Sequence, residues 1–238
     1  PWGYLLVICI IGGGLAFWLF FSGLKLTTAG RAAFIHKTLP LFVTIFAFFF
    51  LREKTSRKQL LALGLMLIGL FFISYTQIKP AEWWSNPRIG DILVLGATFL
   101  WGVENVIAKK SILKGSHQFV VSFARMFFGA VFLFGLAVII GKAGLFLTLT
   151  GTQLLKLLAS TILLFGYVLM FYWSLRYIKV SRAATLLLIA PIVTFILGII
   201  FFHEPVPILQ LIGSALILGG AYFLVQKQKD EEDFAWQN

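Results

Sequence analysis

Four ionisable side chains lie well inside apolar stretches of the sequence: His36, Lys37, Glu104 and Arg125. A charge in a membrane-spanning stretch is costly, so it indicates a function or a partner of opposite charge. Glu104 and Arg125 fall at similar depths in two stretches joined by a short link, and they are predicted to form an ion pair. Such a pair would gate a cavity or carry a proton. The alternatives are that the pair is purely structural, or that Glu104 balances the charge of Lys109 instead.

Lys37 lies about nine residues into its apolar stretch, roughly 13 Å along a helix that rises about 1.5 Å per residue. Ala33, Lys37, Pro40 and Thr44 are spaced by four, three and four residues, so they share one helical face. That face is predicted to look into the protein, which makes Lys37, His36 and Thr44 candidate substrate-binding residues. The alternative is that Lys37 extends its ammonium toward the membrane surface and that His36 only satisfies a neighbouring carbonyl.

Aromatic side chains supply further candidates for a binding site. Trp101 and Tyr167, together with Tyr172 and Trp173, would form one wall of a cavity or would pack in the core. The sequence has no CxxC, HExxH, Gly-rich phosphate loop or GxSxG motif, so no metal, cofactor or catalytic residue is predicted. Cys9 is the single cysteine, which excludes an intramolecular disulfide.

The composition assigns these residues to a membrane protein. The chain has 238 residues, is 60% hydrophobic and 12% charged, and has a mean hydropathy of +0.95, whereas ordinary soluble domains are about 25% charged. A net charge of +11 would suggest nucleic acid as a partner of a soluble protein. Here most Lys and Arg residues lie in short links between apolar stretches, where they set topology, so the predicted partner is the lipid bilayer and no nucleic acid is expected.

A spanning helix needs about 20 mostly apolar residues. Eight stretches qualify: residues 2–22, 28–51, 57–75, 91–109, 118–141, 153–175, 181–203 and 207–226. The links after spans two, four and six, with the region after span eight, carry twelve Lys and Arg residues, against six on the other side. The positive-inside rule therefore places the C-terminus in the cytoplasm of a multi-pass protein of the cytoplasmic membrane.

An internal repeat organises these spans. Residues 31–53 (RAAFIHKTLPLFVTIFAFFFLRE) align without a gap with residues 182–204 (RAATLLLIAPIVTFILGIIFFHE), an offset of 151 (182 − 31). Arg31 matches Arg182, Pro40 matches Pro191 and Glu53 matches Glu204. Both prolines are predicted to kink their helices, and both glutamates are predicted to cap or fix turns at helix ends. His36 and Lys37 correspond to Leu187 and Leu188, so the cation belongs to one copy only.

The two copies lie five spans apart, and an odd number of crossings inverts the second copy. Inverted repeats are common in secondary transporters, where the two halves enclose a site near the midplane. The predicted fold is all-α, with residues 1–75 as the last three helices of a first repeat and 91–226 as a five-helix second repeat. Residues 76–90 form an outer link and 227–238 a disordered polar tail. Two helices of the first repeat are expected to be missing, so the eight spans are expected to belong to a set of ten.

The doubled pattern resembles the EamA type of the drug/metabolite transporter superfamily. It reads AGRAAFIHKTLPLFVTIFAFFFLREKTSRKQLLALGLMLIGL in the first copy and VSRAATLLLIAPIVTFILGIIFFHEPVPILQLIGSALILGG in the second. The resemblance covers nearly the whole chain. It implies a ten-helix secondary transporter of small metabolites, such as amino acids, with both ends in the cytoplasm.

The predicted function is therefore transport of a small-molecule substrate by alternating access, around a site bounded by spans two, four, five and seven. A coupling proton or ion is a possible second partner. One alternative is an exchanger of anionic or phosphorylated metabolites, which Lys37 and Arg125 would suit by charge. A membrane-embedded enzyme or a scaffold without transport is an alternative of another class.

Overall fold

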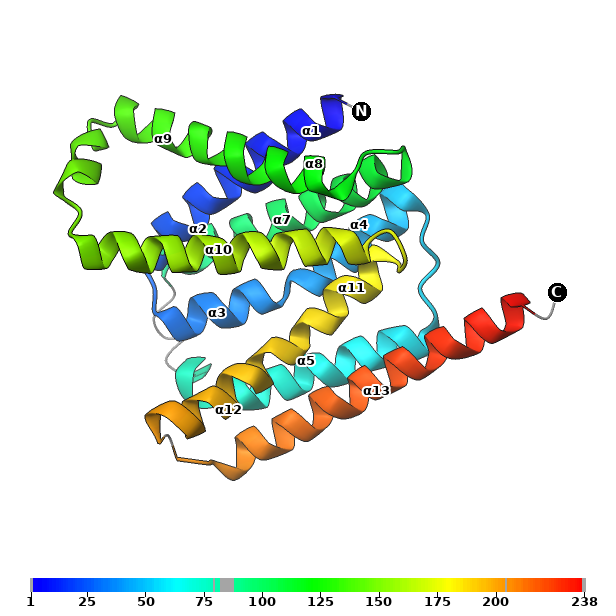
Figure 1. Cartoon of the computed structure of the whole chain (residues 1–238). Coiled ribbons are helices and arrows are strands. Elements are labelled where there is room, and N and C mark those ends of the chain that lie inside the picture. The colour runs from blue at the N-terminus through cyan, green and yellow to red at the C-terminus, as the bar shows by residue number, and fades with distance from the viewer. Residues whose placement is uncertain (1, 79, 82–87, 204, 237–238) are drawn as a thin grey trace.

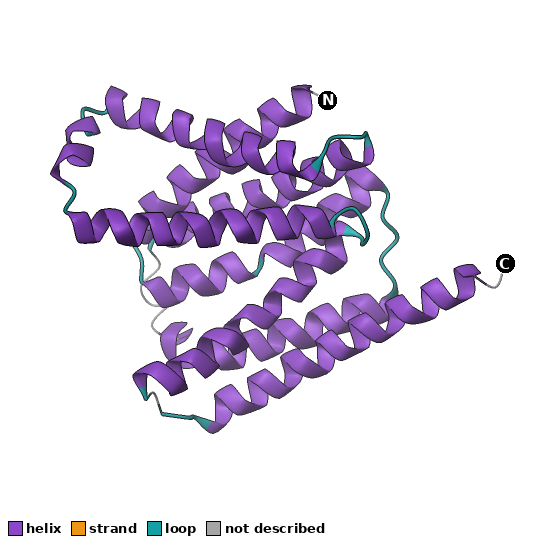
Figure 2. Ribbon diagram, viewed as in Figure 1, coloured by secondary structure: helices purple, strands orange, loops and turns teal. Residues whose placement is uncertain are grey.

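The spans form a bundle of antiparallel helices. The computed structural model describes residues 2–78, 80–81, 88–203 and 205–236, and within these ranges the regular structure is entirely helical (Figure 2). Eight of the described helices are long and apolar enough to cross a membrane, with ends within a few residues of the predicted stretches. Helices suit the lipid bilayer because every backbone hydrogen bond is made inside the helical segment.

The first three spans and the long fourth contain seven described elements. These are α1 (Trp2–Val7), the π-helix η1 (Ile8–Leu15), α2 (Ala16–Leu24), α3 (Ala29–Lys37), α4 (Leu39–Leu51), α5 (Arg57–Ile78) and α7 (Ile89–Leu113). The remaining spans comprise α8 (Gln118–Phe123), the π-helix η2 (Ala124–Phe128), α9 (Gly129–Ile139), the short η3 (Ala143–Thr148), α10 (Gly151–Ser174), α11 (Val180–Leu186), η4 (Leu187–Ile189), α12 (Ala190–Phe202) and α13 (Ile208–Trp236).

Helix α7 lies at the centre of the bundle. It packs against α2, α3 and α4, and its buried residues include Val94, Ala97, Trp101 and Ala108. Helices α5 and α13 lie side by side at the far edge (Figure 1). The links at residues 52–56, 114–117 and 175–179 lie at the same end of the bundle as the C-terminus (Figure 1). We call this end the C-terminal side.

The contact between α5 and α13 follows the inverted repeat. A Cβ added to Gly69 would lie 2.5 Å from the carbonyl oxygen of Gly213, so the two backbones cross closely there. The repeat offset converts Gly69 into Gly220 (69 + 151) and Gly213 into Ala62 (213 − 151). A Cβ on Gly220 would lie 2.9 Å from the Ala62 carbonyl oxygen. The same close contact thus occurs twice, with the roles of the two helices exchanged, as a twofold relation between the halves requires.

The predicted proline kinks are helix interruptions. In span two, α3 ends at Lys37, and Pro40 lies in the first turn of α4. In span seven, η4 separates α11 from α12, and Pro191 lies in the first turn of α12. Proline is tolerated in a first turn because its missing N–H would lack a helical partner anyway. Both spans end on a left-handed residue, Arg52 with φ 54° and His203 with φ 51°, which are again 151 positions apart.

One boundary differs from the prediction. The polar C-terminal stretch, expected to be disordered, continues α13 as a helix to Trp236. Its Lys, Gln and Glu residues are good helix formers, so a helix that leaves the membrane can extend through them. Most of the outer link, including Trp83 and Trp84, lies outside the described residues.

Candidate functional site

Glu104 is the most deeply buried charged residue among the four predicted ones. It lies on the central helix α7 and is 0% exposed. Gly12 of η1 faces it, and a Cβ at position 12 would lie 2.2 Å from the Glu104 Cγ. The Trp101 Nε1 donates a hydrogen bond of 3.0 Å to the Gly12 carbonyl oxygen. A glycine at this point of the first span therefore creates the space that the carboxylate occupies.

Arg125 and Tyr172 complete a closed polar cluster around this carboxylate. The Arg125 Nη1 lies 3.1 Å from Glu104 Oε2 and donates a 2.9 Å hydrogen bond to the Tyr172 hydroxyl. The Tyr172 hydroxyl in turn donates to Glu104 Oε1. The predicted ion pair is therefore present, and a tyrosine bridges it. Because Tyr172 is itself 0% exposed, the triad of Glu104, Arg125 and Tyr172 is shielded from bulk solvent.

Two π-helical segments surround this triad. Arg125 lies in η2, and Gly12 and Gly13 lie in η1, which packs against it. A Cβ on Gly13 would lie 2.1 Å from the Arg125 carbonyl oxygen, and one on Gly129 would lie 2.5 Å from the Gly13 carbonyl oxygen. Short π-helical segments inside α-helices occur frequently at functional sites. Their coincidence with the buried ion pair supports a functional site between spans one, four, five and six.

His36 and Trp101 form the aromatic border of this region. The centre of the His36 ring lies 4.8 Å from the centre of the Trp101 ring and 5.6 Å from that of the Phe20 ring. The His36 Nδ1 is buried without a hydrogen-bond partner among the described residues. Trp101 thus contacts the His36 ring and is hydrogen-bonded to the Gly12 backbone, which lies beside the Glu104 side chain.

Lys37 lies in a different place from the triad. It lines a cavity of about 420 Å³ between α3, α5, α12 and α13, whose wall also includes Pro191. Adjacent residues on a helix point about 100° apart at 3.6 residues per turn, so His36 and Lys37 face different helices. The residues predicted for a single site bounded by spans two, four, five and seven therefore lie in two regions, a buried triad and a cavity at Lys37.

Two other predicted residues form no hydrogen bond with the triad within the described part of the chain. Tyr167 of α10 is 45% exposed and stacks on Phe171 at 6.1 Å. Thr44 of α4 is 8% exposed, and its Oγ1 has no hydrogen-bond partner among the described residues. Their binding of substrate stays a prediction.

The repeat-motif residues join helices at the ends of the bundle. The Glu53 carboxylate accepts hydrogen bonds from the backbone N of Val180 at 3.1 Å and from the Ser181 hydroxyl at 2.8 Å. It therefore caps α11, which belongs to the other half, rather than its own helix. Arg31 forms an ion pair with Asp91 at 3.5 Å, and Arg182 is 6% exposed. Glu204 lies outside the described residues.

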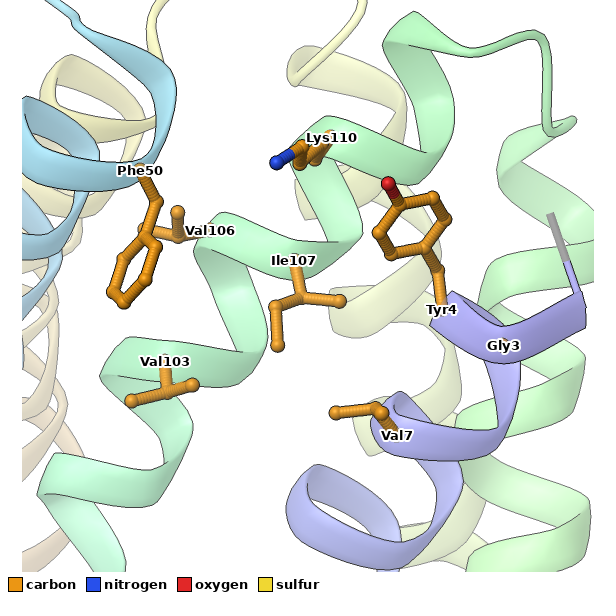
Figure 3. Close-up of a pocket in the computed structure, with 8 residues that line it drawn as sticks. All are labelled: Gly3, Tyr4, Val7, Phe50, Val103, Val106, Ile107 and Lys110. Atoms are coloured by element: carbon orange, nitrogen blue, oxygen red, sulfur yellow. The ribbon is translucent and has the colours of Figure 1, made fainter.

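A further cavity of about 350 Å³ lies near the C-terminal side, between α1 and α4 with α7 behind it. Figure 3 shows Lys110 and Tyr4 at one end of this cavity and the apolar side chains of Val7, Val103 and Ile107 along it. It contains none of the residues that the sequence singled out. Within the described residues, His, Cys, Asp and Glu side chains form no group of three that could hold a metal ion.

The fold and these sites define a multi-pass α-helical membrane protein built from inverted repeats. The EamA-like transporter family matches residues 1–75 and 88–226, so the chain belongs to this family. The chain is 27% identical to "Uncharacterized transporter YoaV" of Bacillus subtilis, covering 84% of this chain and 68% of that protein. It is also 27% identical to an "Uncharacterized transporter" of Archaeoglobus fulgidus, covering 95% and 77% of the two chains.

Another relative, an "Uncharacterized transporter" of Clostridium kluyveri, is 28% identical and covers 97% of this chain and 74% of its own length. A solved crystal structure matches with a TM-score of 0.73 over 94% of this chain and 78% of that chain, at 19% identity. At that identity the match shows the shared fold alone.

Proposed function

We propose that this protein is a secondary transporter that moves a small metabolite across the cytoplasmic membrane by alternating access. Membership of the EamA-like transporter family supports transport. The observation that carries the mechanism is a difference between the two ends of the crossing formed by spans two and seven. These spans are equivalent in the two halves, yet they are packed together at one end and separated by a cavity at the other.

At the C-terminal side the crossing is closed. Helix α4 packs directly on α11, and Ala47 and Ala184 are each 0% exposed. The Glu53 carboxylate caps the first turn of α11, and the Gln59 Nε2 donates a 3.1 Å hydrogen bond to the Ser181 hydroxyl. The Lys179 Nζ donates to the Lys54 carbonyl oxygen at 3.1 Å. These polar contacts all join one half of the repeat to the other.

At the opposite side the equivalent helices are α3 and α12, and the cavity at Lys37 lies between them. Ala33 and Lys37 line it from α3, and Phe195, Gly198 and Phe202 line it from α12. Ala33 is exposed, whereas its repeat equivalent Ala184 (33 + 151) is fully buried. An exchange of these two environments would close one side and open the other, which is the movement that alternating access requires.

The interrupted helices supply a place for this movement to occur. Pro40 and Pro191 each begin a new helical segment in mid-span, so α3 and α12 can tilt without unwinding α4 and α11. Broken helices of this kind frame the sites of many transporters. Glu104 of the triad lies on α7, which packs against α4 of the crossing. A proton on Glu104 would weaken its ion pair with Arg125. This makes Glu104 the candidate for a coupling proton.

A pair of cysteine variants tests the mechanism, because Cys9 is the only native cysteine. In a Cys9→Ser background, Ala33→Cys and Ala184→Cys are matched by the repeat. Vesicles containing each variant are treated with a membrane-impermeant maleimide from one side at a time. We expect Ala33→Cys to react from the side opposite the C-terminus. We expect Ala184→Cys to react only from the C-terminal side, at a rate that changes when a transported solute is present.

Transport itself is measured with the same protein in proteoliposomes filled with a mixture of amino acids and small organic acids. Loss of individual solutes is followed by mass spectrometry against protein-free vesicles. If no solute leaves the proteoliposomes faster than it leaves the protein-free vesicles, the transporter proposal is wrong. If solutes leave but Ala33→Cys reacts equally from both sides, the protein is a channel and alternating access is wrong.

A further inference from the structure

The cavity beside Lys37 has the size and the polarity of a small-molecule site. Its volume is about 420 Å³, within the range of about 300–1,000 Å³ that ligand pockets occupy. Lys37 lies at mid-span, whereas Phe202, Ser74 and Gln210 lie near the ends of α12 and α5 and the start of α13. The cavity therefore extends from the middle of the bundle toward the side opposite the C-terminus, and a solute could enter it from there.

Lys37 is the only charged residue among the described residues that line this cavity. No ion pair or hydrogen bond of its ammonium occurs within the described part of the chain. An ammonium at this depth is costly unless a negative charge or several hydrogen-bond acceptors compensate it. Glu104 pairs with Arg125 and Asp91 pairs with Arg31, whereas no carboxylate of the described residues pairs with Lys37. The compensating charge is therefore expected to come from a ligand.

Comparison with the other half shows that packing does not require this lysine. The repeat equivalent of Lys37 is Leu188 (37 + 151), which is 1% exposed and belongs to the apolar cluster between α5 and α13. The same position of the fold is thus filled by a buried leucine in one half. In the other half a longer, charged lysine lines a cavity. Because the shared fold needs only an apolar side chain at this position, the difference between Lys37 and Leu188 favours a binding role for Lys37.

The rest of the wall indicates what kind of anion would fit. Ser74 and Gln210 add neutral hydrogen-bonding groups, while Phe195, Phe202 and Leu70 give an apolar surface. One cation matches one negative charge; a phosphate dianion is better served by several cations or by the bidentate geometry of arginine. The chemistry therefore favours a carboxylate carried on an apolar or aromatic body.

We propose that the cavity between α3, α5, α12 and α13 binds a small monocarboxylate with an apolar or aromatic body, whose carboxylate pairs with Lys37. The proposal rests on the transport function above, since it names the substrate class at the open end of the crossing. The carboxylate would replace the missing acidic partner of Lys37. The body of the ligand would lie against Phe195 and Phe202.

The test uses benzoate and its neutral analogue benzamide as probes, with thermal unfolding of the detergent-purified chain as the readout. Benzoate is expected to raise the midpoint of the wild-type protein in a saturable way, and benzamide is not. Lys37→Met should weaken benzoate binding by about tenfold to a hundredfold, the equivalent of one charge-assisted hydrogen bond. Lys37→Arg should retain binding because it keeps the charge. Lys142→Met, which removes an exposed lysine from a link, is the matched control and should bind as the wild type does.

Three outcomes overturn the carboxylate proposal: equal stabilisation by benzoate and benzamide, undiminished benzoate binding by Lys37→Met, and no effect of benzoate at any concentration. A lipid headgroup is the other source of an anion. If phosphatidylglycerol in the detergent gives the Lys37-dependent shift and benzoate does not, the occupant is a lipid and the proposal is wrong.

Failure of transport gives a different result from failure of the carboxylate proposal. Lys37-dependent binding of benzoate without flux of any solute in proteoliposomes would contradict the transport function alone. Flux of neutral or cationic solutes that Lys37→Met leaves unchanged would contradict the carboxylate proposal alone.

Discussion

The hydroxyl of Ser181, in the first turn of α11, donates a 2.8 Å hydrogen bond to the carboxylate of Glu53, which follows α4 in the other half of the repeat. The backbone N of Ser181 donates to the same carboxylate at 3.4 Å. A carboxylate at a helix N-terminus also interacts favourably with the helix dipole. Glu53 therefore joins the two halves at the C-terminal side. Under the proposed mechanism this contact must break before that side opens.

Glu53→Gln is expected to loosen the C-terminal side. The amide keeps the size of the side chain but loses the charge, and hydrogen bonds to a charged group contribute about 1.5–3 kcal/mol each. In the Cys9→Ser, Ala184→Cys background, the variant should increase maleimide labelling from the C-terminal side without solute. Glu53→Asp is the control that keeps the charge, and Ser181→Ala should give a smaller increase. Unchanged labelling in Glu53→Gln would mean that this contact does not hold the closed end.

The buried triad predicts a strong dependence of stability on charge balance. Arg125→Met leaves Glu104 without its counterion and should lower the free energy of unfolding by about 3–5 kcal/mol. The double variant Arg125→Met with Glu104→Gln should recover much of this loss, because no unpaired charge remains buried. Thermal unfolding in detergent measures both. A double variant no more stable than Arg125→Met would show that the loss comes from packing.

The reversed pair separates a structural triad from a coupling site. Glu104→Arg combined with Arg125→Glu keeps the opposite charges but moves the carboxylate from α7 to η2. If this variant recovers transport lost in both single variants, the pair is structural and Glu104 is not the proton carrier. We expect the charge-reversed double variant to fold but not to transport, with transport measured as solute efflux under an imposed pH gradient.

Gly13 of η1 and Gly64 of α5 are expected to respond differently to an added methyl group. Gly13→Ala would place a Cβ 2.1 Å from the backbone carbonyl oxygen of Arg125, which cannot rotate away. Overpacking of this kind costs about 1–3 kcal/mol or more, so the variant should unfold at lower temperature than the wild type. Gly64→Ala of α5 is the matched control, because nothing lies within 4 Å of its added Cβ. It should be neutral or stabilising by up to about 1 kcal/mol. Equal behaviour of the two variants would contradict the close crossing at Gly13.

Sequence reasoning found the elements whose signals are long and repeated. Each span is about 20 apolar residues, and the offset of 151 is carried by many matched positions, so the spans and the repeat were readable. The pairing of Glu104 with Arg125 followed from depth alone. Because ionisable residues are rare within these spans, few combinations were possible.

The missed features depend on which face of an apolar helix is turned inward. Tyr167 and Tyr172 are five positions apart on α10, about 140° around the axis, and of the two only Tyr172 forms hydrogen bonds with the ion pair. Gln153, Lys156 and Ser160 lie on the same face of α10 as Tyr167, at spacings of three, four and seven residues, so the polar pattern points to Tyr167 rather than to Tyr172. The π-helical segments were equally hidden, since Gly12 and Gly13 suggest close packing but not a change of helical pitch. The separation of His36 from Lys37 was within reach, because adjacent helical residues cannot share one direction.

The interruptions at Pro40 and Pro191 carry the last prediction. Pro40→Ala restores a backbone N–H in α4 and permits a continuous helix from α3, and an interior proline costs a helix about 3 kcal/mol relative to alanine. Because Pro40 lies in a first turn, the gain is expected to be smaller, with an unchanged or modestly higher unfolding temperature. Transport should nevertheless fall, since α3 could no longer tilt independently of α4.

Pro191→Ala at α12 is expected to behave in the same way, and the two effects should be similar because the positions are equivalent. Leu41→Ala, a half-exposed neighbour of Pro40, is the control for a change of side chain alone. Retained transport in both proline variants, together with unchanged stability, would show that the broken helices are not the hinges of this protein.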